Sequence, residues 1–130
     1  MSDSEPGRRH ARVDLRARAR VSSIDPERDG SGALCFHESD EQCENLSVGG
    51  AFIHTPDPPA RGQRVLLQIH LPDGASVEAV GRVAWTQREL GASGEPHAIG
   101  AGIEFLSNDL ETRGVIERYL EALRSERRMG

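Results

Sequence analysis

Short polar residues and glycines gather in one stretch of the sequence, Glu44–Thr55, between apolar segments. Asn45 offers an amide that both donates and accepts hydrogen bonds, and Ser47 offers a hydroxyl. Gly49 and Gly50 lack a Cβ, so the chain there can adopt a positive φ or another surface can approach closely. A polar turn between strands could therefore grip a flat ligand with hydrogen-bonding edges. The alternative is an ordinary turn in which the Asn and Ser side chains bond only to the local backbone.

A group of arginines near the start of the chain is the second feature with chemical potential. Arg8, Arg9 and Arg12 follow a polar segment that contains Pro and Gly, so we expect them to lie on a flexible arm. Guanidinium groups bind phosphate in bidentate fashion and stack on planar bases. Arg8 and Arg12 could thus close over a ligand that is both anionic and aromatic. The alternative is a solubilising basic tail.

Composition limits the classes of function. A chain of 130 residues is long enough for one domain with a real core. Its 21 acidic and 16 basic residues give a net charge of −5, which argues against bulk binding of DNA or RNA. We see no apolar run long enough to span a membrane and no signal peptide. The two cysteines have no metal-ligand spacing and are expected to be reduced, half-buried strand residues of a cytoplasmic protein.

Catalysis is not indicated by any motif. The five histidines are scattered, without the spacing of metal ligands on a helix. No nucleophile elbow, Cys/His arrangement or isolated carboxylate pair is present, and the glycine-rich segments match neither phosphate-binding pattern. We therefore predict that the protein is not an enzyme and has no metal or cofactor.

The elements that would position these residues are mostly strands. Apolar residues alternate with Arg and Asp from Val13 to Val21, which predicts a strand with one buried face and one face of arginines that could cross to acidic residues on neighbouring strands. Asp25–Gly32 is expected to be a mobile loop, and Glu38–Glu44 either continues a strand past a bulge or loops out. Trp85 is expected to be a core or rim anchor. The other predicted strands are Ala33–His37, Ala51–Thr55, Arg64–Leu71, Val77–Thr86 and Ala98–Leu106.

The apolar period changes near residue 108. Asn108 and Glu111 have the spacing of a capping box, which predicts the start of a helix. Its apolar face would consist of Leu110, Ile116, Tyr119, Leu120 and Leu123. Six or seven antiparallel strands followed by one helix predict a small closed or half-closed β-barrel, plugged or flanked by that helix.

Taken together, the two polar motifs resemble those of the PilZ domain family. They are RxxxR (Arg8 and Arg12) and, after a strand, NxSxxG (Asn45, Ser47 and Gly50). The segments GRVAW (81–85) and GAGIEFL (100–106) follow in the order typical of that family. The resemblance covers about residues 8–124 and divides them into an arm (8–12), a barrel (13–106) and a helix (108–124). Residues 1–7 would be a disordered tail and residues 125–130 a C-terminal tail.

The resemblance implies an all-β fold, a six-stranded antiparallel β-barrel with a C-terminal α-helix, and binding of the second messenger cyclic di-GMP. The motif arginines would contact the phosphates and stack on guanine, the Asn and Ser would bond a guanine edge, and the motif glycine would let the loop approach. Many binding members carry a further Arg where this chain has Gly7, which leaves the nucleotide stoichiometry open. The implied ligand-binding residues are Arg8, Arg12, Asn45, Ser47 and Gly50, with Arg9 and Gly49 as further candidates.

The function predicted from the sequence is that of a non-enzymatic, cytoplasmic cyclic di-GMP receptor. Its arm would become ordered on binding, and the new surface would signal to an unidentified protein partner rather than to DNA or RNA. The alternative is a nucleotide-independent adaptor that acts by protein–protein interaction in motility, pilus or signalling systems. The strand Ala51–Ile53 and the helix face around Tyr119 and Leu123 would be its docking surfaces.

Overall fold

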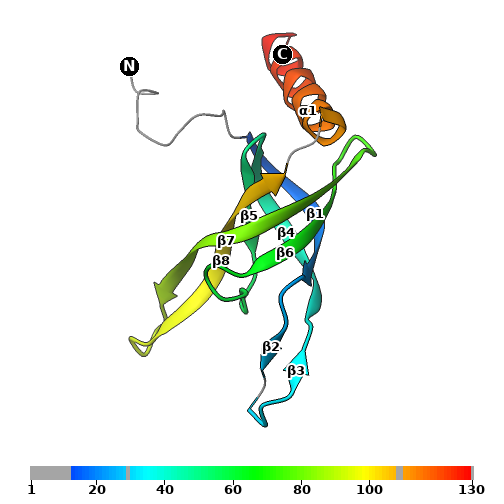
Figure 1. Cartoon of the computed structure of the whole chain (residues 1–130). Helices are drawn as coiled ribbons and strands as arrows, with labels where there is room; N and C mark the ends of the chain where they lie inside the picture. Colours follow the sequence, from blue (N-terminus) through cyan, green and yellow to red (C-terminus); the bar gives the residue numbers. More distant parts are fainter. Residues whose placement is uncertain (1–12, 29, 108–109, 130) are drawn as a thin grey trace.

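The computed structural model of this chain describes residues 13–28, 30–107 and 110–129. These residues form eight strands and one helix (Figure 1). The elements are β1 (Val13–Ser23), β2 (Glu27–Arg28), β3 (Leu34–Cys35), β4 (Glu38–Ser47), β5 (Gly50–His54), β6 (Arg64–His70), β7 (Ser76–Leu90), β8 (Pro96–Ser107) and α1 (Leu110–Met129).

Six of the strands close into an antiparallel barrel in the order β1-β4-β5-β8-β7-β6. The barrel closes because β1 pairs with β4 on one side and with β6 on the other. Closure leaves no barrel strand with a free edge, which removes the main route by which sheets aggregate. The predicted six-stranded antiparallel barrel with a C-terminal helix is confirmed.

The alternating pattern of β1 produces the expected two faces. Ala17, Ala19 and Val21 are buried inside the barrel, while the intervening arginines are exposed. Arg20 crosses to the neighbouring strand, where it donates to Glu38 at 2.9 Å and to Asp40 at 3.1 Å. The hydrogen bond from Arg20 lowers the pKa of the Asp40 carboxyl. The outward arginine face and its bonds to acidic residues on a neighbouring strand are therefore confirmed.

The helix α1 covers one end of the barrel (Figure 1). Ile116, Tyr119 and Leu120 are buried in the same core as the strand residues, and burying each such side chain is worth about 1.5–3 kcal/mol. Leu110 was expected on this buried face, but it is 88% exposed because it lies at the first residue of the helix, before the turn that meets the barrel. The helix also continues to Met129, beyond the expected end at residue 124. The predicted cap at Asn108 lies outside the described residues.

The segment Asp25–Gly32, which was expected to be only a loop, contributes a strand to a small hairpin. β2 and β3 pair antiparallel and project from the end of the barrel opposite α1 (Figure 1). Gly32 has a φ of 87°, which favours glycine, and its carbonyl accepts a hydrogen bond from the Arg28 side chain at 2.7 Å. This bond joins the two ends of the turn. The strand expected at Ala33–His37 is present as β3, but β2 has only two residues and shows no period in the sequence, so the hairpin itself was not predicted. After it, Glu38–Glu44 continues as part of β4 instead of looping out.

Candidate functional site

The corner between β4 and β5 holds the polar residues that the sequence singled out. Ser47 is the last residue of β4 and is only 6% exposed. Its hydroxyl accepts a hydrogen bond from the Gly49 amide at 3.2 Å and donates to the Gly50 carbonyl at 3.4 Å. The Ser47 side chain thus closes the turn on itself, as the alternative of an ordinary Ser turn predicts.

Gly50 is needed for the close approach of two strands. Among the described residues the glycines with positive φ are Gly32, Gly62, Gly74 and Gly94, so neither glycine of this corner uses that freedom. A Cβ on Gly50 would instead overlap the backbone carbonyl of Ile103 on β8. The other corner glycine, Gly49, accepts a hydrogen bond from the Phe105 amide at 2.9 Å. Both contacts hold the corner against β8.

A β-bulge turns Asn45 to the outside of the barrel. Cys43 and Leu46 are fully buried and face inward, and the pairing of β4 with β5 shifts register between Cys43 and Asn45. The extra residue, Glu44, places Asn45 outward although it lies only two positions from an inward residue. Asn45 is half-buried, and among the described residues its side-chain amide has no hydrogen-bond partner. This amide is therefore available to a ligand.

The residue beneath Asn45 on the inner side is a thiol that is sealed in the core. Cys43 donates from its sulfur to the Asn45 carbonyl at 3.2 Å. Burial raises the pKa of the Cys43 thiol to about 12. Cys43 therefore supports the backbone at the bulge and supplies no reactive thiolate.

An aromatic pair extends the outer face beyond Asn45. Phe52 lies opposite Asn45 on β5, and its ring stacks on that of Trp85 at 5.3 Å between centroids and 24° between planes. Gly102 of β8 pairs with both Phe52 and Trp85, and a Cβ there would overlap the Trp85 ring. Trp85 keeps 40% of its surface exposed. The Asn45 amide, the Phe52 ring and the Trp85 ring therefore lie in a row across β4, β5 and β7, with Gly102 of β8 between Phe52 and Trp85.

A bulge also sets the position of Trp85, which was expected to be a core or rim anchor and lies on the outer face. Val77, Ala79, Gly81 and Val83 alternate as buried residues, and strict alternation would point Trp85 inward. The pairing of β7 with β8 shifts between Val83 and Trp85, which turns the indole outward. The sequence signal that could have indicated the outward position of Trp85 is the glycine-rich strand with which it pairs, β8.

The first strand begins beside this corner. Val13 pairs with Leu46 and Asp14 pairs with Asn45, so the chain enters the barrel next to the NxSxxG motif. Arg8, Arg9 and Arg12 precede this entry point in the sequence and lie outside the described residues. The structure therefore brings together Asn45, Ser47, Gly49 and Gly50, and it does not show the three arginines.

In the described part of the chain, no three His, Cys, Asp or Glu side chains gather as a metal site would require. In the same residues, no helix has both the length and the apolar character needed to span a membrane.

Comparison with known proteins identifies the family. The family model of the PilZ domain matches residues 6–122. The chain belongs to the PilZ domain family. No curated protein sequence gives a significant match.

Solved structures share the fold at low sequence identity. The PilZ domain of YcgR from Escherichia coli, solved with c-di-GMP, is 13% identical with a TM-score of 0.63, and 95% of each chain is covered. The Bacillus subtilis inhibitor of motility MotI/DgrA is 16% identical (TM-score 0.67), with 95% of this chain and 54% of that chain covered. The K. pneumonia MrkH–c-di-GMP complex is 17% identical (TM-score 0.65), with coverage of 96% and 56%. The chain thus spans about half the length of the last two proteins.

Proposed function

We propose that this protein is a non-enzymatic receptor for cyclic di-GMP, which binds on the outer face of the barrel at the β4–β5 corner. Asn45, Ser47 and Gly50 would form the fixed part of the site, with Gly49 beside them. Arg8 and Arg12, with Arg9 as a further candidate, would form the part that closes over the ligand. The solved PilZ domain of YcgR with c-di-GMP, which shares the fold, supports this choice of ligand.

The observation that carries the proposal is the unpaired amide of Asn45 beside an exposed aromatic surface. Directly opposed residues on antiparallel strands have Cβ atoms about 4.5–5.5 Å apart, so Asn45 and Phe52 lie within the width of one purine. Guanine combines a planar π-face with a hydrogen-bonding edge. Asn45 would offer its amide to the guanine edge. Trp85 lies three strand spacings from Asn45, about 14 Å, so its exposed ring would contact another part of the ligand, beyond the Phe52 ring.

The arginines would supply the contacts to phosphate. Arg12 directly precedes Val13, whose strand partner is Leu46, so covalent geometry holds its Cα about 3.8 Å from that of Val13. Arg8 lies four positions before Arg12, a span of at most about 14 Å when extended. Both guanidinium groups can therefore reach a ligand at the corner and bind its phosphates in bidentate fashion.

Ordering of the arm would convert binding into a signal. Fixing the backbone of each arm residue costs about 1–2 kcal/mol of conformational entropy, which the charged hydrogen bonds and stacking must exceed. The ordered arm and the barrel face beside it would then form a surface for a protein partner, for example in motility. The free cysteines are consistent with the reducing cytoplasm, where we place this receptor.

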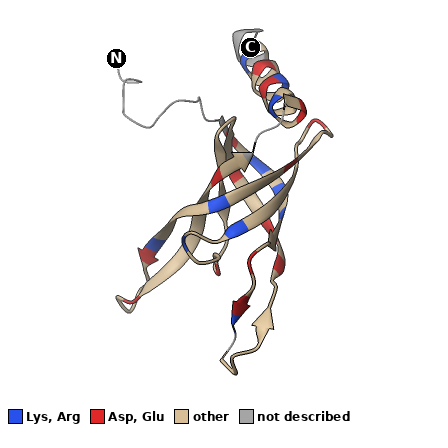
Figure 2. Cartoon of the chain, in the orientation of Figure 1, with Lys and Arg blue, Asp and Glu red and all other residues tan. Residues whose placement is uncertain are grey.

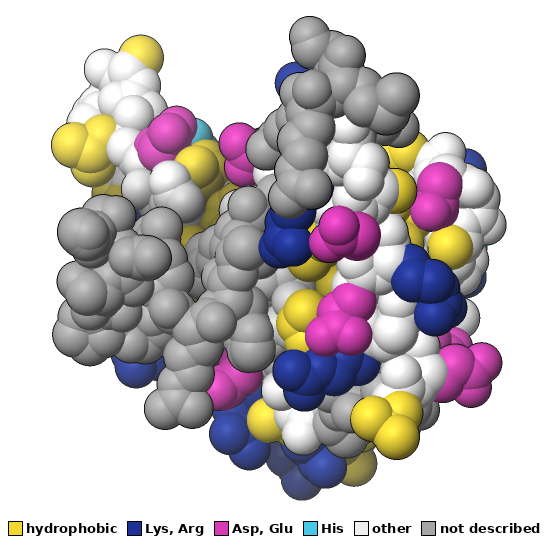
Figure 3. Space-filling model, turned by 90° about the horizontal axis from the view of Figure 1, so that it is seen from above, with side chains coloured by type: hydrophobic (Ala, Val, Ile, Leu, Met, Phe, Trp, Pro, Cys, Tyr) yellow, Lys and Arg dark blue, Asp and Glu magenta, His cyan; other side chains and the backbone are white. Residues whose placement is uncertain are grey.

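The nucleic-acid alternative has little support in the distribution of charge. Arginines and acidic residues are interspersed on the barrel strands, and the face seen from above mixes both signs (Figures 2 and 3). A surface that binds DNA or RNA would need a continuous basic stripe. We therefore propose that the partner of the ligand-bound form is a protein and not DNA or RNA.

The adaptor alternative loses the docking surfaces that the sequence suggested for it. Ala51, Phe52 and Ile53 are buried in the barrel wall, at 6%, 7% and 1% exposure. Tyr119 is only 6% exposed because it packs against the barrel, and Leu123 is half-buried. These residues hold the fold together and cannot dock a partner without unfolding it.

Isothermal titration with cyclic di-GMP tests the proposal. We expect saturable binding to the wild type, complete loss in Arg8→Ala or Arg12→Ala, a loss of about fivefold or more in Asn45→Ala, and a smaller loss in Ser47→Ala. Arg61→Ala is the matched control, because Arg61 is exposed in the loop that follows the end of β5 away from the corner. Equal affinity of the arginine and Asn45 variants with wild type, or absence of heat with a folded wild-type protein, would refute the assigned site.

A further inference from the structure

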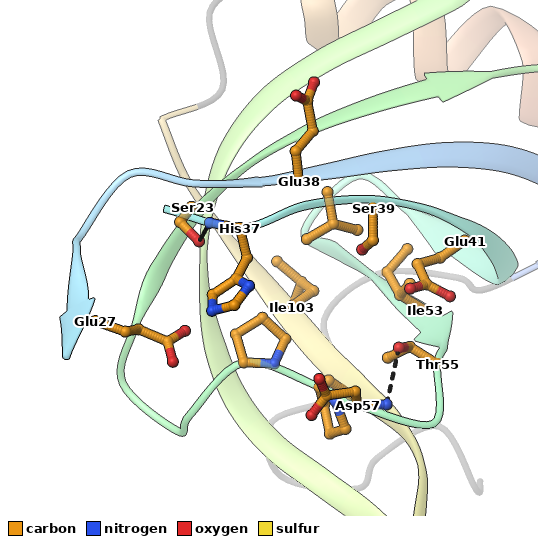
Figure 4. A pocket seen from close by; sticks show the side chains of 14 residues that line it. Ser23, Glu27, His37, Glu38, Ser39, Glu41, Ile53, Thr55, Asp57 and Ile103 are labelled. Carbon is orange, nitrogen blue, oxygen red and sulfur yellow. Dashed lines mark hydrogen bonds between the residues drawn. The ribbon is translucent and has the colours of Figure 1, made fainter. Parts of the chain in front are cut away.

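A cavity of roughly 220 Å³ lies at the end of the barrel opposite the helix, where β1 finishes and β4 begins. Its inner wall is apolar and includes Val21, Ile53 and Ile103. In Figure 4 Ile103 lies in the middle, with Glu27 and His37 to its left, Ile53 and Glu41 to its right, and Asp57 below. The cavity is therefore an apolar pocket with an acidic rim.

Most carboxylates of this rim form no ion pair with the residues that the structure describes. Among the described residues, Glu27, Glu41 and Asp57 have no basic side chain within ion-pair distance. Glu38, the fourth acidic residue, is engaged elsewhere by Arg20 at 2.9 Å. No arginine lines the cavity. Three uncompensated carboxylates around an apolar wall favour a ligand that is cationic at one end and aliphatic along its length.

The size of the cavity and the surface beside it indicate the source of that cation. The volume is below the roughly 300–1,000 Å³ of pockets that enclose a drug-sized molecule, and it suits a single side chain. The hairpin that carries Glu27 into the rim also exposes Leu34 and Phe36, at 59% and 66%. A free amine would leave these apolar groups in water, whereas a polypeptide anchored in the cavity could continue along the hairpin and cover them.

We propose that this cavity binds an arginine or lysine side chain presented by a partner polypeptide. The aliphatic stem packs on Val21, Ile53 and Ile103, and the cationic head lies among the rim carboxylates. The site is separate from the nucleotide site. Asp14, beside the corner, and Ser23, at the cavity, are nine positions apart on β1, which is about 30 Å of strand. Both sites can be occupied at once, and binding here does not depend on the nucleotide.

Titration of the full ¹⁵N-labelled chain with short peptides, followed by amide chemical shifts, tests this proposal. The probe is acetyl-Leu-Arg-Leu-amide, and its neutral isostere acetyl-Leu-citrulline-Leu-amide is the matched peptide. We expect the arginine peptide to give saturable shifts at Ser39, Glu41, Thr55 and Asp57, and the citrulline peptide to bind at least tenfold more weakly. Acetyl-arginine-amide should bind more weakly than the tripeptide, because it cannot reach the hairpin.

Two substitutions that conserve shape localise the site. Glu41→Gln and Asp57→Asn should each weaken the arginine peptide by about two- to fivefold, as expected for a partly exposed ion pair. Glu89→Gln, which removes an exposed carboxylate from β7 outside the cavity, should leave the affinity unchanged.

Three results would overturn the proposal. They are equal binding of the citrulline peptide, shifts that map outside the cavity, and no shifts at about 10 mM arginine peptide. Equal affinity for acetyl-arginine-amide would reject the polypeptide in favour of a small organic cation. None of these outcomes affects the proposal that the protein binds cyclic di-GMP, because the calorimetric titration tests that proposal independently.

Discussion

Replacing Gly50 by Ala should damage the barrel before it affects any ligand. The added Cβ would overlap the Ile103 carbonyl, a backbone atom in the middle of β8 that no rotamer change can move. The ladder between β5 and β8, in which Gly50 pairs with Glu104, must therefore separate at this point. Overpacking of this kind costs about 1–3 kcal/mol. With a urea m value of about 2 kcal/mol/M, a loss near 2 kcal/mol lowers the unfolding midpoint by about 1 M.

The assay is urea unfolding followed by fluorescence of Trp85, the one tryptophan in the chain. Gly30→Ala is the matched control, because a Cβ at Gly30 meets nothing within 4 Å, and its free energy of unfolding should stay within about 0.5 kcal/mol of wild type. If Gly50→Ala unfolds at the same urea concentration as Gly30→Ala, the close approach of β5 to β8 does not explain this glycine. The motif glycine would then have to be explained by the ligand alone.

Two further predictions concern titration and thiol chemistry. Asp25 accepts from the Arg64 guanidinium at 2.7 Å and from the Arg64 amide at 3.0 Å, and these bonds lower the pKa of its carboxyl. The stabilising effect of the Asp25 carboxylate is thus complete above its ordinary pKa of about 3.9, and it is lost as pH falls through the lower pKa of the folded state. Asp25→Asn should therefore be less stable than wild type at pH 7 but not in strong acid. A gap in unfolding midpoint that does not change with pH would contradict this. A disulfide reagent at pH 8 should modify only the partly exposed Cys35 in the native protein, and it should modify Cys43 only in urea. Simultaneous reaction of both thiols without urea would show that the core opens.

The chain order of the elements could be predicted because their signals are local. Alternation in β1 requires only that one face of a strand meets the core, so the outward arginines follow from the residues between Val13 and Val21. The apolar spacing of Ile116, Tyr119 and Leu120 likewise identifies the buried face of α1. The polar corner could be located as well, since Asn, Ser and Gly favour turns through their own side chains and backbone. The partners of these elements could not be predicted in this way.

The outer face of the candidate site depends on the register between paired strands, which the residues of one strand alone do not show. Asn45 and Trp85 both point outward only because a bulge interrupts the alternation one residue earlier, and a bulge is defined by the strand opposite. Glu27, Glu41 and Asp57 meet at one cavity for a similar reason, since strand pairing brings their segments to the same end of the barrel.

The amino-acid sequence by itself therefore determined the class of fold, the buried faces of β1 and α1, and the position of the polar motifs, because each depends on residues close together in the chain. Only the tertiary structure decided which side chains of the corner point outward and why Gly50 is required. It also decided that three unpaired carboxylates surround a cavity. These features depend on strand register and closure of the barrel, which bring together residues that the sequence separates.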